Sequence, residues 1–171
     1  MMQVTIFGGH DGILQLDKWF YLTLFGGCEL RRPTLARQLL GRRRSEQTGE
    51  LIRRKPFFLT LFGGAEIKSP TLAAEFIDLR ELIHSGVLPL SDWDRALAEL
   101  GRIEESVASF TMFGGFDERS LPTEEEEIDG LAIQCHLGNI DESTRVVLQS
   151  GIGQRDPERR AVVRRAVQAG V

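Results

Sequence analysis

Four copies of one short phrase constrain the fold of this chain more than any other feature. Each copy reads Thr, a hydrophobic residue, Phe, Gly and Gly, and the four phenylalanines are Phe7, Phe25, Phe62 and Phe113. The two middle copies are similar over a longer stretch, because 22–36 and 59–73 are identical at 11 of 15 positions. Repeated units stack like on like, since one unit alone cannot bury its apolar face. We therefore expect the four copies to lie next to one another in space.

Each copy has the pattern of a strand that ends at a sharp corner. In 21–25 two leucines fall on one face of an extended chain, and Tyr21, Thr23 and Phe25 fall on the other. Both faces carry apolar side chains, which predicts burial on both sides. Glycine adopts positive φ angles without strain, so each Gly-Gly pair favours a corner or a bulge. The eight glycines are Gly8, Gly9, Gly26, Gly27, Gly63, Gly64, Gly114 and Gly115.

These units predict a mainly β fold with helical insertions. The expected architecture is a short β-solenoid-like stack of the four repeats, with a helical hairpin and a C-terminal helix. In this interpretation the phenylalanines fill a core and the glycines turn corners. A glycine loop that binds phosphate is the alternative, but no Lys followed by Ser or Thr comes after any Gly-Gly pair.

The extended form of the phrase resembles a known family. Phe-Gly-Gly-x-Glu-[Leu/Ile]-[Arg/Lys]-x-Pro, at 25–33 and 62–70, is similar to the C-terminal domain of LiaF-like proteins, which are bacterial cell-wall-active-antibiotic response proteins. The resemblance covers 2–36, 57–73 and 108–118. It implies a short stack of β turns and a regulatory role in the envelope stress response. This chain departs from the family because it lacks the N-terminal membrane helices and carries helical insertions.

Length and composition place the chain among globular proteins. Its 171 residues are 42% hydrophobic, and the formal net charge is −4. No apolar run approaches the roughly 20 residues of a membrane helix, and the first residues lack the pattern of a signal peptide. We expect a cytoplasmic protein, with a peripheral position at the inner face of the membrane as an alternative. Cys28 and Cys135 have no disulfide-like spacing and are predicted to be free thiols.

The repeats and the segments between them predict one main domain and a tail. Residues 1–150 are interpreted as a single β-stack domain, and 151–171 as a C-terminal helical tail that opens at Asp156 and Pro157. The insertions of the main domain are a basic one at 31–56, a helical one at 69–107 and an acidic one at 117–130.

The basic insertion carries most of the predicted function. It holds nine Arg or Lys against Glu46 and Glu50, in a chain that is acidic as a whole. Such asymmetry indicates an anionic partner, whether an acidic protein surface or a phospholipid headgroup. Nucleic acid is disfavoured, because no aromatic residues interleave with the cations. The alternative is a solvated loop whose arginines balance the acidic segment. The predicted docking residues are Arg42, Arg43, Arg44, Arg53, Arg54 and Lys55.

The remaining segments carry weaker patterns. Trp93, Leu97, Leu100 and Ile103 recur at helical spacing and predict one buried helix face. Thr123 and Glu126 have the spacing of a capping box, which indicates a solvated first helical turn for 124–127. The alternation in 131–137 and the apolar run in 145–148 predict two strands.

No motif of catalysis is present. The chain has no Cys-x-x-Cys, His-Glu-x-x-His, Gly-x-Ser-x-Gly or Walker phrase, and its three histidines lie in unlike places. We therefore predict no catalytic residue, no cofactor and no metal, and a protein that is not an enzyme. The expected function is a structural or accessory subunit that docks onto other protein subunits of a larger, membrane-bound or soluble assembly. The alternative is an envelope-stress regulator of the LiaF-like kind.

Overall fold

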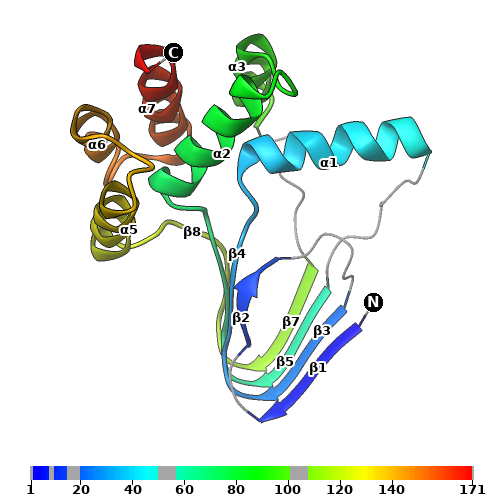
Figure 1. The fold of residues 1–171 in the computed structure, drawn as a ribbon. Helices are drawn as coiled ribbons and strands as arrows, with labels where there is room; N and C mark the ends of the chain where they lie inside the picture. Colours follow the sequence, from blue (N-terminus) through cyan, green and yellow to red (C-terminus); the bar gives the residue numbers. More distant parts are fainter. Residues whose placement is uncertain (1, 8–9, 15–19, 50–56, 101–107, 171) are drawn as a thin grey trace. The chain divides into compact units, whose positions relative to one another are not determined.

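A computed structural model describes residues 2–7, 10–14, 20–49, 57–100 and 108–170 (Figure 1). The chain divides into two compact units. The first, here called the sheet unit, comprises Met1–Pro33, Arg42–Ser69 and Glu104–Ser120. The second, the helical unit, comprises Thr34–Gly41, Pro70–Ile103 and Leu121–Val171. These units do not coincide with the division into 1–150 and 151–171 that the sequence suggested.

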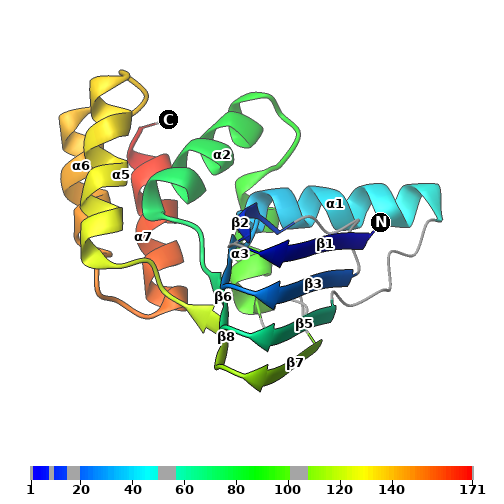
Figure 2. The same ribbon diagram turned by 90° about the horizontal axis from the view of Figure 1, so that it is seen from below.

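The sheet unit is built from two parallel four-stranded sheets, whose strands can be followed in Figures 1 and 2. Sheet A has the order β1 (Met2–Phe7), β3 (Phe20–Phe25), β5 (Phe57–Phe62) and β7 (Ala108–Phe113). Sheet B has the order β2 (His10–Ile13), β4 (Cys28–Arg31), β6 (Ala65–Lys68) and β8 (Phe116–Ser120). The order of the repeats in the sequence is therefore their order in space.

The strands of sheet A pair in a single register. Thr23 is opposite Thr5 on one side and Thr60 on the other, and Thr60 is opposite Thr111. Phe7, Phe25, Phe62 and Phe113 share a second row. Each strand thus places like residues beside like, as the repetition of the phrase led us to expect.

The core of the sheet unit is formed by alternate side chains of both sheets. Tyr21 and Phe58 of sheet A are buried, with stacked rings 4.5 Å apart, and Leu30 and Ile67 of sheet B are buried with them. Thr23 and Thr60 are buried on the same side of sheet A as the two aromatic rings. Burial of these positions alone gives β3 and β5 their alternating pattern of exposure.

The first glycine of each pair is required where the backbones of successive corners meet. Gly63 has a φ of 134° and Gly114 a φ of 155°, a region that residues with a Cβ rarely adopt. A Cβ on Gly63 would overlap the carbonyl group of Gly26, and one on Gly114 would overlap the carbonyl group of Gly63. The first glycine of the corner therefore excludes a side chain for two reasons. Its φ angle is positive, and the backbone of the neighbouring corner occupies the space that a Cβ would need.

Six helices lie among the described residues. They are α1 (Leu35–Thr48), α2 (Leu72–His84), α3 (Leu90–Ala98), α5 (Glu124–His136), α6 (Glu142–Gln149) and α7 (Asp156–Ala169). In the helical unit α2 packs against α5 and α7, and α6 packs against both of these helices. Its core holds Phe76, Leu79, Trp93 and Val163, all fully buried. Leu97 and Leu100 are partly buried against this core, and Ile103 lies outside the described residues.

Local sequence explains where these helices begin. The Thr71 side chain accepts a hydrogen bond from the Ala74 N–H at the start of α2. Thr123 and Glu126 form the predicted capping box at the start of α5. Asp141 accepts from the Thr144 N–H at the start of α6, and Pro157 lies in the first turn of α7, where its missing N–H costs no hydrogen bond.

The expectation of a mainly β, solenoid-like fold is wrong. The chain forms an α/β fold with two parallel sheets, and more of its described residues lie in helices than in strands. The segments outside the repeats build their own core, with 16 buried hydrophobic residues against seven between the sheets among the described residues. The repeats alone therefore predicted the wrong fold class, because the larger core of the chain lies outside them.

Three local expectations are corrected as well. Residues 131–137 and 145–148 belong mainly to helices α5 and α6 and are not strands. Short apolar runs fit both periods, and here the caps at Thr123 and Asp141 with acidic first turns favour helix. The basic segment is not a loop over 35–48 but helix α1, whose Leu, Arg and Gln residues are good helix formers.

Gly63→Ala should destabilise the protein by at least about 3 kcal/mol, because the new Cβ meets the Gly26 backbone and the φ angle is strained. Gly41→Ala is the matched control. Gly41 lies within α1, and no atom lies within 4 Å of the position that a Cβ would take, so alanine should stabilise the helix by up to about 1 kcal/mol. Urea unfolding of both variants measures the effect. Equal stability of the two variants would contradict the close packing of the corners.

Candidate interaction surface

The outward side of sheet A is apolar at every described position of its two central strands. In β3 and β5 the positions between the buried ones are Phe or Leu, and all are partly exposed. The edge strands continue this pattern, since Val4, Ile6, Phe110 and Met112 are 47% to 55% exposed. We call this surface the apolar face, and it consists of Val4, Ile6, Phe20, Leu22, Leu24, Phe57, Leu59, Leu61, Phe110 and Met112.

The expectation that both sides of these strands are buried is therefore wrong. A sheet that faces water on one side ordinarily alternates apolar and polar residues. Sheet A alternates buried and exposed positions, but the exposed ones are hydrophobic. Contiguous apolar surface of this kind marks a site of interaction.

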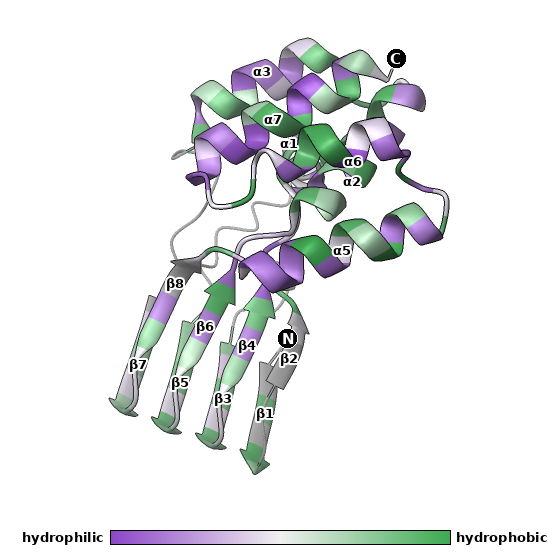
Figure 3. Ribbon diagram, turned by 90° about the vertical axis from the view of Figure 1, so that its left-hand side faces the viewer, coloured by the Kyte–Doolittle hydropathy of each residue, from purple (hydrophilic) through white to green (hydrophobic). Residues whose placement is uncertain are grey.

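A row of aromatic rings, the Phe ladder, runs along the carboxyl ends of these strands. The rings of Phe7 and Phe25 are 5.3 Å apart, and the next two steps, from Phe25 to Phe62 and from Phe62 to Phe113, are 5.1 Å each. Neighbouring rings lie within 9° of parallel. The four rings are 78%, 44%, 46% and 60% exposed in that order. Figure 3 shows the hydrophobic colour of these strand ends side by side.

The structure thus places the predicted repeat residues together, but it does not bury the phenylalanines. Each Phe is the last residue of its strand, followed by the first glycine of the corner, so its ring stacks on its neighbours without entering the core between the sheets. Gly26, Gly27, Gly63, Gly64, Gly114 and Gly115 form the corners, while Gly8 and Gly9 lie outside the described residues.

The outer side of sheet B has the opposite character. Glu29 is in register with Glu66, and Glu66 with Asp117, which gives a row of carboxylates across three strands. The Nζ atom of Lys68 lies 3.2 Å from Oε1 of Glu29. Within one unit, therefore, one outer sheet surface is charged as expected for contact with water and the other is apolar.

The predicted docking residues are only partly described. Arg42, Arg43 and Arg44 are consecutive residues of α1, and because a helix turns 100° per residue they spread around its axis instead of lining one side. Arg42 and Arg44 are exposed and Arg43 is half-buried. Arg53, Arg54 and Lys55 lie outside the described residues.

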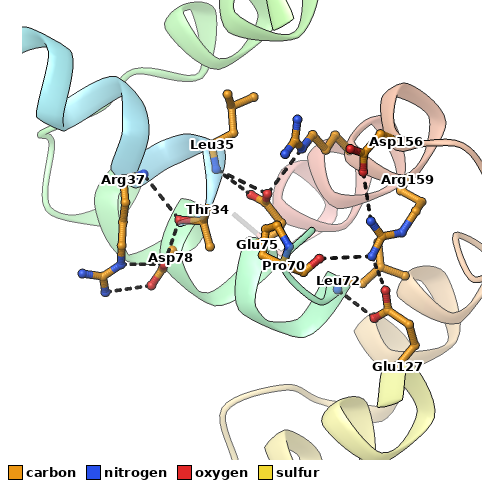
Figure 4. Close-up of polar contacts among 11 residues, drawn as sticks. Thr34, Leu35, Arg37, Pro70, Leu72, Glu75, Asp78, Glu127, Asp156 and Arg159 are labelled. Carbon is orange, nitrogen blue, oxygen red and sulfur yellow. Dashed lines mark hydrogen bonds and ion pairs between the residues drawn. The ribbon is translucent and has the colours of Figure 1, made fainter. Parts of the chain in front are cut away.

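The cations of the basic segment do not all face an outside partner. The Nε atom of Arg37 lies 2.6 Å from Oδ2 of Asp78, and its Nη2 atom lies 2.9 Å from Oδ1 (Figure 4). The Thr34 hydroxyl donates to the same Asp78 carboxylate at 2.8 Å. The hydrogen bond and the charge of Asp78 raise the pKa of Arg37. This arginine stabilises the contact of α1 with α2 within the helical unit.

Two buried glutamates were not identified from the sequence. Glu127 of α5 is buried with Arg159 of α7, with which it forms an ion pair, and its Oε2 atom accepts from the Leu72 N–H at 2.8 Å (Figure 4). Arg159 also donates to the Pro70 carbonyl at 3.2 Å and lies 3.1 Å from Oδ1 of Asp156. The prediction of a solvated turn for 124–127 is wrong for Glu127, because the capping box does not report which side of the helix is covered.

Glu75 of α2, like Glu127, accepts from the N–H at the start of another helix and lies beside an arginine of α7. Its two carboxylate oxygens accept from the Leu35 N–H at 3.2 and 3.3 Å, and Oε1 lies 3.3 Å from Nε of Arg160. Burial raises the pKa of Glu75 to about 7, and Arg160 and the Leu35 N–H oppose this rise. Leu35 and Leu72 are the first residues of α1 and α2, so both glutamates bind the positive N-terminal end of another helix.

The described part of the chain holds no cluster of ligands suited to a metal ion. It contains no group of three or more His, Cys, Asp or Glu side chains arranged in that way. Cys28 is buried, Cys135 is half-buried, and neither takes part in a disulfide. None of the described helices has the length and apolar character needed to cross a bilayer.

Comparisons with known proteins do not identify a family for this chain. No protein-family model, no curated protein and no solved structure matches the chain. The resemblance to LiaF-like proteins therefore stays a prediction that rests on the Phe-Gly-Gly phrases.

The free energy of unfolding should fall as the pH rises from about 4.5 to about 7. The folded protein holds a proton on Glu75 in this range, and the unfolded chain does not, so the contribution of this group is complete below its unfolded pKa and is lost as the pH passes its folded pKa. The loss is roughly 3 kcal/mol for a shift of this size. The charges of Arg160 and Arg159 lower the pKa of Glu75, and the charge of Asp156 raises it.

Glu75→Gln isolates this contribution, because glutamine stays neutral at every pH. Urea unfolding at several pH values should show a steeper decline for the unchanged protein than for the variant. Parallel stability curves for the two proteins would show that Glu75 does not titrate in this range.

Proposed function

We propose that the chain is a non-catalytic structural or accessory subunit that docks onto a larger protein assembly through the apolar face of sheet A. The observation that carries this proposal is the continuous hydrophobic outer side of the sheet, with Val4, Ile6, Phe110 and Met112 about half exposed. Sheet B of the same unit presents Glu29, so the lack of polar residues on sheet A is specific to that surface.

The composition of the apolar face suits a protein partner. Interface centres are enriched in aromatic residues and Met and depleted of charge, and they gain about 25 cal/mol for each Å² of apolar surface removed from water. The face holds Phe20, Phe57 and Phe110, with the rings of the first two stacked 5.8 Å apart. The Phe ladder is a separate exposed row of four rings at the carboxyl ends of the same strands. Such rigid aromatic side chains are the residues that dominate binding energy at interfaces.

The basic residues supply a second, electrostatic contact in this proposal. Arg42 and Arg44 are exposed on α1, and an acidic protein surface would offset the repulsion among the clustered cations. An anionic membrane beside the assembly would do so as well, with about 1 kcal/mol for each Arg or Lys near the surface. The proposed location is cytoplasmic, at the periphery of the assembly.

Substitution on the two central strands tests docking through the apolar face. Leu22→Gln with Leu59→Gln replaces two neighbouring outward residues and leaves the strand edges and the core between the sheets unchanged. In native extracts of the source cells, the unchanged chain should sediment together with the other subunits of a large assembly, and the double variant should separate from those subunits, with at least a tenfold lower bound share.

Ile133→Gln with Val146→Gln is the matched control. Both side chains are exposed and apolar, 57% each, and they lie on helices of the other unit. This control should sediment as the unchanged chain does, and circular dichroism should show that both double variants are folded. Equal loss from both pairs, or no assembly at any natural concentration, would contradict the proposal.

The cationic contact has its own test. Replacing Arg42, Arg43, Arg44, Arg53, Arg54 and Lys55 by Gln should weaken docking at low salt by at least tenfold and leave little difference at high salt, because salt screens exposed charges. Co-sedimentation with the purified assembly and with anionic vesicles separates a protein partner from a lipid one. Identical binding of the unchanged protein and the variant at every salt concentration would show that these cations have no role in docking and belong to a solvated segment.

A regulatory module of the envelope stress response is the second candidate. The Phe-Gly-Gly-x-Glu phrases favour it, since the structure assembles Phe25 and Phe62 into one exposed row. A deletion strain with an envelope-stress reporter separates the candidates. Altered reporter output with no change in the assembly would support the regulator.

A further inference from the structure

Both edges of sheet A are regular strands without the usual protection. β1 and β7 are the outer strands in the order of the sheet, and Figure 2 shows them at its two ends. Natural edge strands carry charges, prolines or bulges that prevent pairing with another chain. β1 reads Met-Gln-Val-Thr-Ile-Phe and β7 reads Ala-Ser-Phe-Thr-Met-Phe, and neither contains a charged residue or a proline.

Sheet B shows the protection that sheet A lacks. Its edge strand β8 carries charged residues and is irregular where it pairs with β6, between Glu66 and Lys68. A bulge of this kind ends regular pairing. The other edge strand of sheet B, β2, contains the charged Asp11. Among the described edge strands, β1 and β7 are therefore the two that carry neither charge nor proline.

The two edge strands of sheet A carry complementary backbone groups. The Gly26 N–H donates to the Phe62 carbonyl at 2.9 Å, and the Gly63 N–H donates to the Phe113 carbonyl at 2.9 Å. Each strand therefore offers a glycine N–H to the phenylalanine carbonyl of the next. Gly114 occupies the donor position beside β7, and Phe7 at the end of β1 occupies the acceptor position.

The side chains repeat the same relation. Thr111 and Phe113 of β7 belong to the rows in which Thr5 and Phe7 of β1 lie. The two terminal rings of the Phe ladder are also its most exposed, at 78% for Phe7 and 60% for Phe113. A ring added beyond either end would stack as the internal rings do.

We infer that a second copy of this chain adds its β1 to the β7 edge in parallel, in the register of the four internal strands. The pairing continues sheet A and the Phe ladder from one molecule to the next. Because the interface joins two different edges, each added copy leaves one of each kind free, and the assembly grows as an open series. The inference goes beyond the proposed function, since it uses the strand edges and leaves the apolar face available for another partner.

Proline on either edge provides a directional test. Backbone groups of successive strand residues point to opposite sides, and the Phe113 carbonyl points to β5, so the Met112 N–H points away from β5. The same alternation directs the Thr5 N–H away from β3, because β1 and β3 have the register of β3 and β5. Met112→Pro and Thr5→Pro thus each remove one outward donor, and proline is tolerated at a strand edge on its solvent side.

Sedimentation velocity of the purified full chain over a hundredfold range of concentration gives the readout. The unchanged chain and Met112→Ala should grow through an open series of species, and each proline variant alone should stay a single chain. An equimolar mixture of the two proline variants should form a two-chain species and nothing larger, since the intact β7 edge of one meets the intact β1 edge of the other.

Three results would overturn the inference. They are a single-chain species for the unchanged protein at all concentrations, association that both prolines leave unchanged, and a mixture that forms no two-chain species although the unchanged chain associates. The mixture also guards against misfolding, because misfolded variants cannot complement each other. Leu22→Gln with Leu59→Gln should keep the open series, so failure of the apolar-face proposal and failure of this inference are distinguishable.

Discussion

The close approach of successive backbones at the glycine corners is the constraint on which the sheet unit depends. The space beside Gly63 is occupied by the Gly26 carbonyl, and the space beside Gly114 by the Gly63 carbonyl. With no Cβ in the way, the strands on both sides of the corner keep one register, and like residues meet in rows. The Phe ladder follows from this register, because each Phe directly precedes a corner.

The helical unit depends on a different interaction, two carboxylates that each serve a distant helix. Glu127 and Glu75 accept from the first N–H groups of α2 and α1, and each lies beside an arginine of α7, Glu127 beside Arg159 and Glu75 beside Arg160. A buried carboxylate without such partners would be costly, and here each one satisfies an N–H that the helix itself cannot. The arrangement ties α1, α2, α5 and α7 together through polar contacts that only one packing provides.

The surfaces of the sheet unit connect this architecture to function. Both sheets are parallel and share the core, yet Glu29 and its neighbours face outward from sheet B, while residues such as Leu59 face outward from sheet A. The proposed docking would remove this aromatic-rich surface from water, and aromatic side chains dominate binding energy at interfaces. The proposed pairing of edge strands would add a second contact, along the direction in which the strands are stacked.

The fold class could not be predicted correctly from the sequence, but several local features could, because they depend on local chemistry. The four phrases, the glycine requirement, the capping box at Thr123 and the first-turn proline Pro157 are set by residues close to one another in the chain. The helical or extended state of 131–137 was not, since alternation over seven residues fits both periods until a cap and a partner decide. The burial of Glu127 and Glu75 likewise required Arg159 and Arg160, which lie 32 and 85 residues away. The sequence alone determined which residues repeat and where the chain turns, whereas only the tertiary structure decided which side of each element is covered, because burial depends on what distant segments bring to that side.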